Sequence, residues 1–252
     1  MDLELSGKRA IVTGASRGIG KAIALALAHE GVDLVLASRT AAPLEASALG
    51  IADATKRKVV AITADTGDDQ SVKALVKQAA QALGGVDILV NNAAIPGGAG
   101  PAARVSELTT AALLTDVNVK VAGYLRLAQA VAPYQIEAGW GRIINIGGLA
   151  ARSTGQYIAS VRNAAVSALT KNLADEFGPL GVTAVAIHPG ATRTERTTPE
   201  QEQAFSTTNS VRRLIDASDI AWLVTVLASP RSIAINGETI AAGGGTPKVI
   251  NY

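Results

Sequence analysis

Cysteine is absent from this sequence of 252 residues. Disulfide bonds and thiolate chemistry are therefore excluded as sources of stability or catalysis. Histidine is scarce as well: His29 and His188 lie far apart, and neither belongs to a cluster with metal-ligand spacing. Structural and catalytic metals need several such ligands close together. We therefore expect no bound metal.

Long apolar runs and a strong net charge are also missing. No stretch of about 18 uncharged apolar residues occurs, so no membrane span is predicted. Residues 1–8 contain acids and no apolar core, unlike a signal peptide. With a net charge of +2 and no long basic run, the chain is not expected to bind nucleic acid. These features favour a cytoplasmic protein with a small-molecule substrate.

What is present is a regular alternation of short apolar runs and longer helical segments. The runs are apolar throughout, which is typical of strands covered on both faces. The pattern predicts one α/β domain over residues 1–252, with a doubly wound parallel sheet of about seven strands and helices on both faces. The expected strands are 9–12, 33–38, 58–64, 86–91, 142–146, 182–187 and 238–241. The expected helices are 21–28, 43–57, 68–83, 107–117, 119–138 and 158–177.

A glycine-rich turn, TGASRGIG from Thr13 to Gly20, connects the first strand to the first helix. Backbone N–H groups at a helix N-terminus attract anions, and the helix dipole strengthens the attraction. Glycines in such a turn permit a tight bend, close approach of a phosphate and close helix–strand packing. The turn is interpreted as a pyrophosphate cradle, and an ordinary strand-to-helix turn is the alternative. Its predicted cofactor residues are Gly14, Ser16, Arg17, Gly18, Ile19 and Gly20.

Five further motifs follow in order along the chain. Together with TGASRGIG they resemble the short-chain dehydrogenase/reductase family over essentially the whole sequence. The resemblance implies a single Rossmann domain that binds NAD(P), and a homotetramer or dimer formed through helices 158–177 and 119–132. The five motifs are NNAA at 91–94, DVNV around Asn118, GRIINI at 141–146, PGATRT at 189–194 and INGE at 235–238.

The end of the second strand indicates which dinucleotide is preferred. An acid there usually binds the free 2′-hydroxyl of NAD, whereas arginine favours the 2′-phosphate of NADP. This sequence has Ser38 and Arg39, with Arg17 in the nearby turn. NADP(H) is therefore favoured over NAD(H), although two solvated surface arginines, or dual specificity, would give the same sequence.

The resemblance also implies where the rest of the cofactor lies. Asp65 and Thr66 are expected to line the adenine, and Asn92 and Ala93 the adenosine side. The nicotinamide end is expected to contact the motif after the sixth strand. The residues concerned there are Pro189, Gly190, Thr192 and Thr194.

The catalytic set implied by the resemblance is altered. A serine, a tyrosine and a lysine four residues after the tyrosine are expected, with an asparagine upstream. The corresponding positions hold the pair 147–148, both glycine, then Ala159 and Asn163; only Asn118 remains. Tyr157 lies two residues before Ala159, about 200° away around a helix. It can reach the site only from a preceding loop; otherwise it packs at the helix entry or contacts substrate.

These observations leave more than one function open. The leading hypothesis is an NADP(H)-dependent oxidoreductase with a rearranged site in which Asn118, Tyr157 and Asn163 are the catalytic candidates. Its substrate would be a small carbonyl, alcohol or imine. The alternatives are a non-redox nucleotide-binding sensor or scaffold, and a lyase or isomerase that uses the same pocket. The walls of this pocket are expected to come from segments 94–104 and 148–156 and from segment 194–210. The last is a polar stretch whose pattern does not decide between helix and loop, and we expect it to cover the site.

Overall fold

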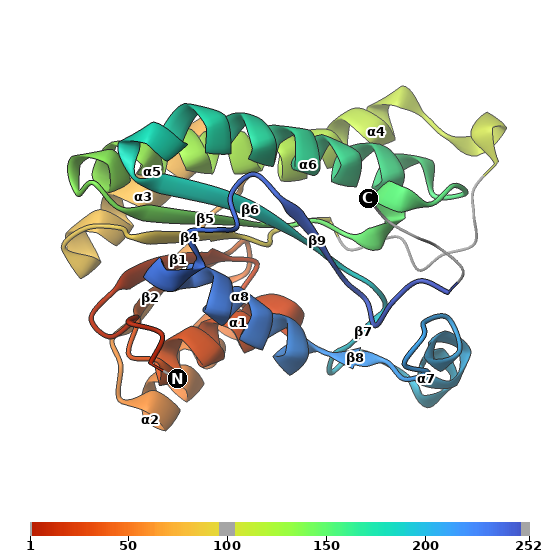
Figure 1. The fold of residues 1–252 in the computed structure, drawn as a ribbon, viewed down its shortest axis with the longest axis horizontal. Coiled ribbons are helices and arrows are strands. Elements are labelled where there is room, and N and C mark those ends of the chain that lie inside the picture. The colour runs from red at the N-terminus through yellow and green to blue at the C-terminus, as the bar shows by residue number, and fades with distance from the viewer. Residues whose placement is uncertain (1, 96–103, 248–252) are drawn as a thin grey trace.

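Seven parallel strands form the centre of the molecule in the computed structural model, which describes residues 2–95 and 104–247 (Figure 1). The strand order is β3-β2-β1-β4-β5-β6-β9, so the order reverses between β1 and β4. Every neighbouring pair in this sheet is parallel. The strands are β1 Arg9–Thr13, β2 Asp33–Ser38, β3 Val59–Thr63, β4 Ile88–Asn91, β5 Gly141–Ile146, β6 Val182–Pro189 and β9 Thr239–Ala242.

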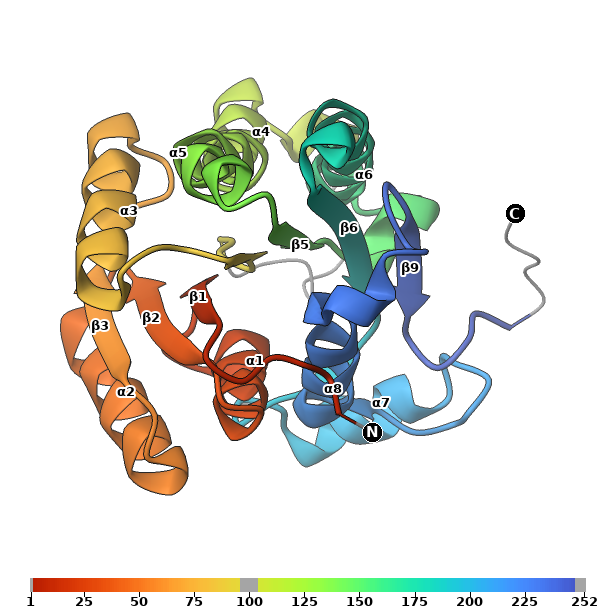
Figure 2. The ribbon, with the colours of Figure 1, turned by 60° about the vertical axis from the view of Figure 1, so that its left-hand side comes forward.

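Helices cover both faces of this sheet (Figures 1 and 2). One face carries α1 Gly18–His29, α2 Ala41–Thr55 and α8 Ala217–Ala228. The opposite face carries α3 Asp69–Leu83, α5 Gly123–Glu137 and α6 Tyr157–Phe177. This arrangement confirms the doubly wound α/β fold predicted from the sequence.

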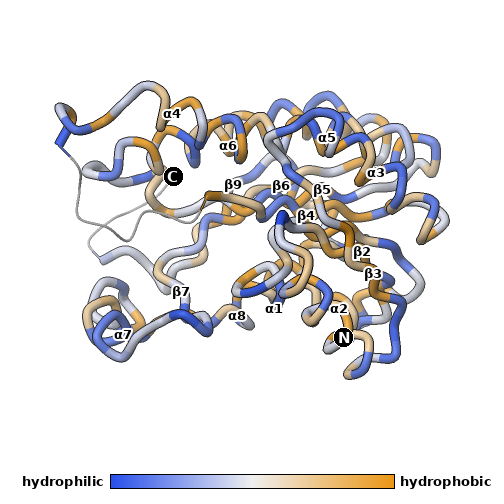
Figure 3. Tube along the Cα trace, turned by 180° about the vertical axis from the view of Figure 1, so that it is seen from behind, coloured by the Kyte–Doolittle hydropathy of each residue, from blue (hydrophilic) through white to orange (hydrophobic). Residues whose placement is uncertain are grey.

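The apolar strands explain why both faces need a cover. Along β1, Ala10 and Val12 pack in the core beneath α1, whereas Ile11 packs in the core beneath α3 and α5. All three side chains are completely buried, and such burial is the main favourable contribution to folding. Figure 3 shows the hydrophobic residues concentrated along the strands, while hydrophilic residues lie mainly on the outer turns.

The predicted elements agree with the structure within a few residues, with three differences. The helices expected at 107–117 and 119–138 are joined without a break: α4 Thr110–Val117 continues through a π-helical turn, Asn118–Ala122, into α5. The sequence prediction missed α8 altogether. No helix in the described ranges is long and apolar enough to cross a membrane.

The third difference is the expected cover at 194–210. It contains α7 Pro199–Ser206, and it lies between two short strands, β7 Thr192–Arg193 and β8 Ile215–Asp216, which pair in parallel. Thr198 and Gln201 cap α7 reciprocally, because each side chain accepts a hydrogen bond from the other residue's backbone N–H. Residues 96–103 of the expected wall 94–104 lie outside the described residues.

Candidate functional site

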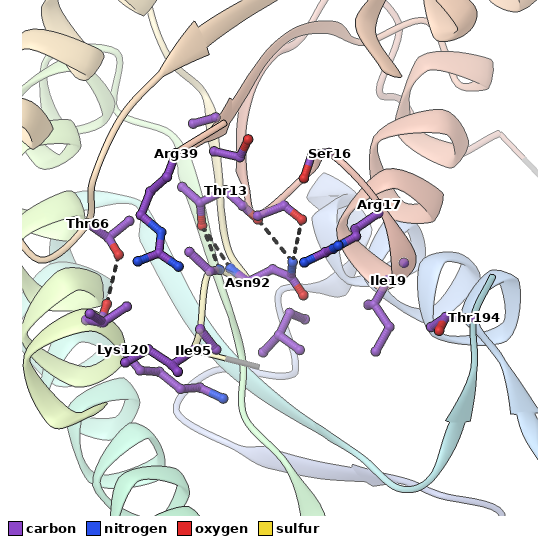
Figure 4. A pocket seen from close by; sticks show the side chains of 18 of the residues that line it. Thr13, Ser16, Arg17, Ile19, Arg39, Thr66, Asn92, Ile95, Lys120 and Thr194 are labelled. Atoms are coloured by element: carbon purple, nitrogen blue, oxygen red, sulfur yellow. Dashed lines mark hydrogen bonds between the residues drawn. The ribbon is translucent and has the colours of Figure 1, made fainter. Parts of the chain in front are cut away.

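A cavity of about 440 Å³ lies at the carboxyl ends of the central strands (Figure 4). In an open parallel sheet, ligands bind at this edge, where the strand order reverses. Thirteen of the sixteen predicted cofactor residues line the cavity. They are Gly14, Ser16, Arg17, Gly18, Ile19, Ser38, Arg39, Thr66, Asn92, Ala93, Pro189, Gly190 and Thr194.

The glycine turn is locked to the end of β4 by reciprocal hydrogen bonds. Thr13 Oγ1 accepts from the backbone N–H groups of Asn92 and Ala93, at 3.0 and 3.1 Å. Asn92 Nδ2 donates to the carbonyl oxygens of Thr13 and Gly14. A Cβ at Gly14 would lie 2.8 Å from Asn92 Nδ2, and one at Gly20 only 2.3 Å from the carbonyl oxygen of Gly14. Glycine is therefore required at both positions for this turn to form.

Three of the predicted cofactor residues do not line this cavity. Gly20 packs behind the turn, as just described. Asp65 uses Oδ1 to accept from the backbone N–H of Gly67 at 2.8 Å, which stabilises the start of the segment before α3. Thr192 lines a neighbouring cavity instead.

Two arginine side chains give the cavity a cationic rim. Figure 4 shows the guanidinium groups of Arg17 and Arg39 on opposite sides of Asn92, each pointing toward it. Among residues 2–95 and 104–247, neither guanidinium has an ion-pair partner. Ser38, at the end of β2, donates to the carbonyl oxygen of Thr40 and adds no negative charge. The rim is thus suited to a phosphate group.

The N-terminus of α1 is in contact with a carboxylate of the protein itself. The backbone N–H of Gly18 donates to Glu195 Oε1 and Oε2, at 3.1 and 3.2 Å. Glu195 follows β7, so the segment that leads to α7 reaches across to the glycine turn. A carboxylate at this position shows that the cradle accepts an anion.

A second, larger cavity of about 940 Å³ adjoins the first. The two cavities share Gly147, Arg162, Pro189, Gly190, Thr194 and Arg196. Gln201 and Phe205 of α7 are among the residues that line the larger one. The smaller cavity, with its cationic rim, is thus continuous with a larger one through these shared residues.

The three catalytic candidates occupy different surroundings. Asn118 lines neither cavity: its Nδ2 donates to the Gly67 carbonyl oxygen at 3.0 Å, and its Oδ1 accepts from Arg126 at 2.8 Å. Tyr157 is the first residue of α6, 47% exposed, and also lines neither cavity. The loop position that its predicted role required is therefore not observed. Only Asn163 is buried and lines the larger cavity.

Sequence analysis overlooked Lys120, which lies in the π-helical turn. Its side chain is only 3% exposed, and Nζ donates to the Gly147 carbonyl oxygen at 3.1 Å and to Asn163 Oδ1 at 2.9 Å. The pKa of Lys120 is lowered to about 7, chiefly by burial and also by the positive charge of Arg162, while Asp116 opposes the shift. The available signal was a lysine set among apolar residues two positions after Asn118.

His188 is buried near the end of β6. Its Nε2 lies 3.3 Å from Ser167 Oγ. Burial lowers its pKa to about 4, and the positive charges of Lys120 and Arg152 contribute to the shift. The ring is therefore neutral at physiological pH.

Comparison with known proteins agrees with this architecture. The model of the family described as short chain dehydrogenase matches residues 8–204. This chain belongs to the short-chain dehydrogenase family. It is 33% identical over 259 residues to the 7alpha-hydroxysteroid dehydrogenase of Escherichia coli K12, covering 99% of this chain and 98% of that protein.

Two similar solved structures contain nicotinamide dinucleotides. A short-chain dehydrogenase of Burkholderia cenocepacia in complex with NADP is 34% identical, with a TM-score of 0.86 over 96% of this chain and 98% of that one. A 7 alpha-hydroxysteroid dehydrogenase complexed with NADH and 7-oxo glycochenodeoxycholic acid is 32% identical, with a TM-score of 0.89 over 99% and 98%. The comparisons therefore support a nicotinamide dinucleotide cofactor and oxidoreductase chemistry for the family member described here.

Proposed function

We propose that this short-chain dehydrogenase is an NADP(H)-dependent oxidoreductase that acts on a small carbonyl, alcohol or imine substrate. The observation that carries the proposal is the pair Arg17 and Arg39, which reach into the cleft beside a strand end with no acid. Bidentate, charge-assisted contacts from arginine suit the 2′-phosphate of NADP. The same groups offer little that is specific to the 2′-hydroxyl of NAD.

The cleft fits the remainder of the cofactor. The backbone at Gly14 and Gly18 would hold the pyrophosphate at the start of α1, once the Glu195 carboxylate that accepts from the Gly18 N–H has moved away. Thr66 and Ala93 would lie along the adenosine, and Pro189 and Thr194 beside the nicotinamide. When bound, the nicotinamide supplies or accepts the hydride. The adjoining cavity is the proposed substrate chamber.

The serine, tyrosine and lysine of the family are, we propose, replaced here by Gly147 or Gly148, Ala159 and Asn163. A carbonyl substrate still develops negative charge on its oxygen and needs a proton there. The aromatic hydroxyl nearest in sequence, that of Tyr157, lies outside both cavities. A substrate that needs little help from an acid, such as a protonated imine or an activated carbonyl, suits this site best.

We further propose that the protein forms a homodimer or homotetramer through α5 and α6. Val161 on α6 and Leu125 on α5 are apolar and 50% and 38% exposed. Exposed apolar residues on neighbouring helices are typical of an interface between subunits. Light scattering in solution tests this proposal, and a monomeric mass would contradict it.

Titration calorimetry with NADPH and with NADH tests the proposed cofactor. NADPH is expected to bind at least about tenfold more tightly, in line with one charge-assisted contact to a phosphate. The same samples are then followed at the absorbance band of the reduced nicotinamide with a panel of ketones, aldehydes and imines. Oxidation of NADPH with any of them supports the oxidoreductase, whereas tight binding with no oxidation would favour a nucleotide-binding sensor.

A further inference from the structure

The ammonium group of Lys120 is buried at the site and has no role in the function proposed above. Lys120 is almost fully enclosed, and placing a charged amine in such surroundings is costly unless the charge is used or well compensated. A protonated lysine has three N–H donors. Two of them have acceptors, Gly147 O and Asn163 Oδ1. The amine also lines the cofactor cavity, so a further donor can reach a ligand there (Figure 4).

The backbone directs this side chain toward the cavity. Lys120 lies at the centre of the π-helical turn Asn118–Ala122, a rare geometry that is frequent at functional sites. Asn118 secures the start of the turn through its bonds to Gly67 and Arg126. Arg126 Nη1 also donates to the carbonyl oxygen of Asn118, at 3.2 Å. The turn is thus held in place by side chains that do not themselves line the cavity.

Two acceptors then fix the position of the amine between the two cavities. Gly147 belongs to both cavities, and Asn163 lines the larger one. Lys120 Nζ therefore lies where the proposed cofactor cleft meets the proposed substrate chamber. Asn163 stands at the position where the family resemblance implies a lysine, so a cationic group enters this region from a different helix.

Resting on the proposed function, we propose that Lys120 is the catalytic acid–base residue of this enzyme, exchanging a proton with the reacting oxygen or nitrogen of the substrate. In reduction, the carbonyl carbon receives a hydride from the reduced nicotinamide, which is oxidised, and the π electrons of the carbonyl move to oxygen. The new O–H bond forms as a Lys120 Nζ–H bond breaks. The neutral amine then takes a proton from water, and oxidation of an alcohol reverses each step.

The surroundings of the amine suit proton transfer near neutral pH. Asp116, on α4, pairs with Arg162, on α6, at 2.7 Å, and the two charges act on the pKa of Lys120 in opposite directions. His188, on β6, is neutral near pH 7. The lowered pKa of Lys120, about 7, is close to the value that best serves a general acid–base group at physiological pH.

Other groups nearby are less suited to this role. The hydroxyl of Tyr124 donates to the carbonyl oxygen of Ile146 at 2.9 Å, and complete burial raises its pKa. Arg162 is engaged with Asp116, and its guanidinium does not lose a proton in proteins. His188 is a poor proton donor, because its ring is already neutral at pH 7 and a neutral imidazole does not readily give up its remaining proton. Lys120 is the remaining titratable side chain among the described residues lining the cofactor cavity that can exchange a proton near pH 7.

Replacement of the lysine tests the proposal. Lys120→Met removes the amine with little change in length, and Lys171→Met, at an exposed position on α6, is the matched control. We expect single-turnover oxidation of NADPH to slow by at least about 100-fold in Lys120→Met and to stay near the wild-type rate in Lys171→Met. The melting temperature of Lys120→Met should be unchanged or higher, because the variant no longer buries a charge. A lower melting temperature with an unaffected rate would show a structural lysine and overturn the proposal.

A second measurement does not depend on turnover. In protein labelled at the lysine side chains, the resonance that disappears in Lys120→Met should titrate near pH 7 in the wild type. A titration near the ordinary pKa of lysine, about 10.4, would overturn the proposal. Wild-type turnover that survives in Lys120→Met within about fivefold would overturn the role of Lys120 but leave the oxidoreductase standing. Absence of any turnover in the wild-type protein, with NADPH bound, would overturn both.

Discussion

The backbone N–H of Gly18 donates to the side-chain carboxylate of Glu195, with both oxygens within 3.2 Å. Glu195 is 177 residues away in sequence and belongs to the segment between β7 and α7. Its negative charge therefore occupies the helix N-terminus that we assign to the pyrophosphate. Binding of the cofactor then requires that the carboxylate leave, which couples the position of this segment to occupancy of the cleft.

Removal of this charge should strengthen cofactor binding. We expect Glu195→Gln to tighten NADPH binding by about two- to fivefold, which is the range expected for one charge at a helix terminus. Glu200→Gln, on the exposed side of α7, removes the same charge without a contact to the turn and is the control. Titration calorimetry measures the NADPH affinity of both variants relative to the wild type. Weaker binding in Glu195→Gln would show instead that this side chain supports the bound state.

Replacement of Arg39 should change the choice of cofactor. We expect Arg39→Ser to weaken NADPH binding by about 10- to 100-fold, because a charged contact to the 2′-phosphate is lost. NADH, which has no such phosphate, should bind as before. Arg57→Ser serves as the control, since Arg57 pairs with Asp33 away from the cleft. Equal losses for NADPH and NADH in Arg39→Ser would contradict the assignment.

Asn163 should tune the protonation of Lys120. A carboxylate introduced by Asn163→Asp would lie close to Nζ, which Asn163 Oδ1 contacts at 2.9 Å. An opposite charge at this distance favours the protonated amine and raises its pKa, by about 1–3 units. The pH at which the rate of NADPH oxidation changes should rise accordingly. An unchanged pH profile would mean that a different group controls the rate.

Tyr157 should contribute little to turnover. Its position at the exposed start of α6 keeps the ring out of both cavities. We expect Tyr157→Phe to oxidise NADPH within about twofold of the wild-type rate, since no acid–base contribution of the usual size is lost. The comparison should be made under single-turnover conditions. A loss of about 100-fold or more would restore the tyrosine to the catalytic set.

His188 should make the fold sensitive to acid. Its pKa is about 4 in the folded protein, below the ordinary value of 6.5, so the unfolded chain binds the proton more readily between these values. The contribution of the neutral His188 to the free energy of unfolding is complete above pH 6.5. It is lost as the pH falls toward 4, and the total loss is of the order of 3 kcal/mol. Urea unfolding at pH 7 and pH 5 should show roughly half of this loss, because pH 5 lies between the two pKa values, and His188→Gln should reduce the difference. An equal loss in the variant would assign the effect to other groups.

The fold could be predicted from the sequence because strands that are buried on both faces are apolar along their whole length, and this pattern is visible in the sequence. The apolar runs of β2 and β6 are typical of parallel strands that are covered on both faces, and the structure shows both strands buried in this way. The separation expected at Asn118 was wrong for a physical reason. Its side chain, which often ends a helix, is held by Arg126 and Gly67, and the backbone widens into a π turn.

The site was harder to predict because its contacts are long-range. Most of the cofactor cleft follows from motifs that lie at strand ends, where the fold itself brings them together. Lys120 and Asn163, by contrast, are 43 residues apart on two different helices, and no local pattern shows that one bonds to the other. Glu195 was missed for the same reason: its role depends on the course of a polar segment across α1.

Gly147 and Gly148, which follow β5, leave little room for a larger side chain at the positions where the family resemblance implies a serine. A Cβ at Gly147 would lie 2.2 Å from His188 Cδ2, and one at Gly148 would lie 2.8 Å from Asn163 Nδ2. A serine at position 147 would require the buried His188 ring to move, and a serine at position 148 would require the Asn163 amide to shift. A hydroxyl at either position therefore has a packing cost that depends on its neighbour, and the cost is greater at Gly147, where the neighbour is a buried ring rather than the end of an amide side chain.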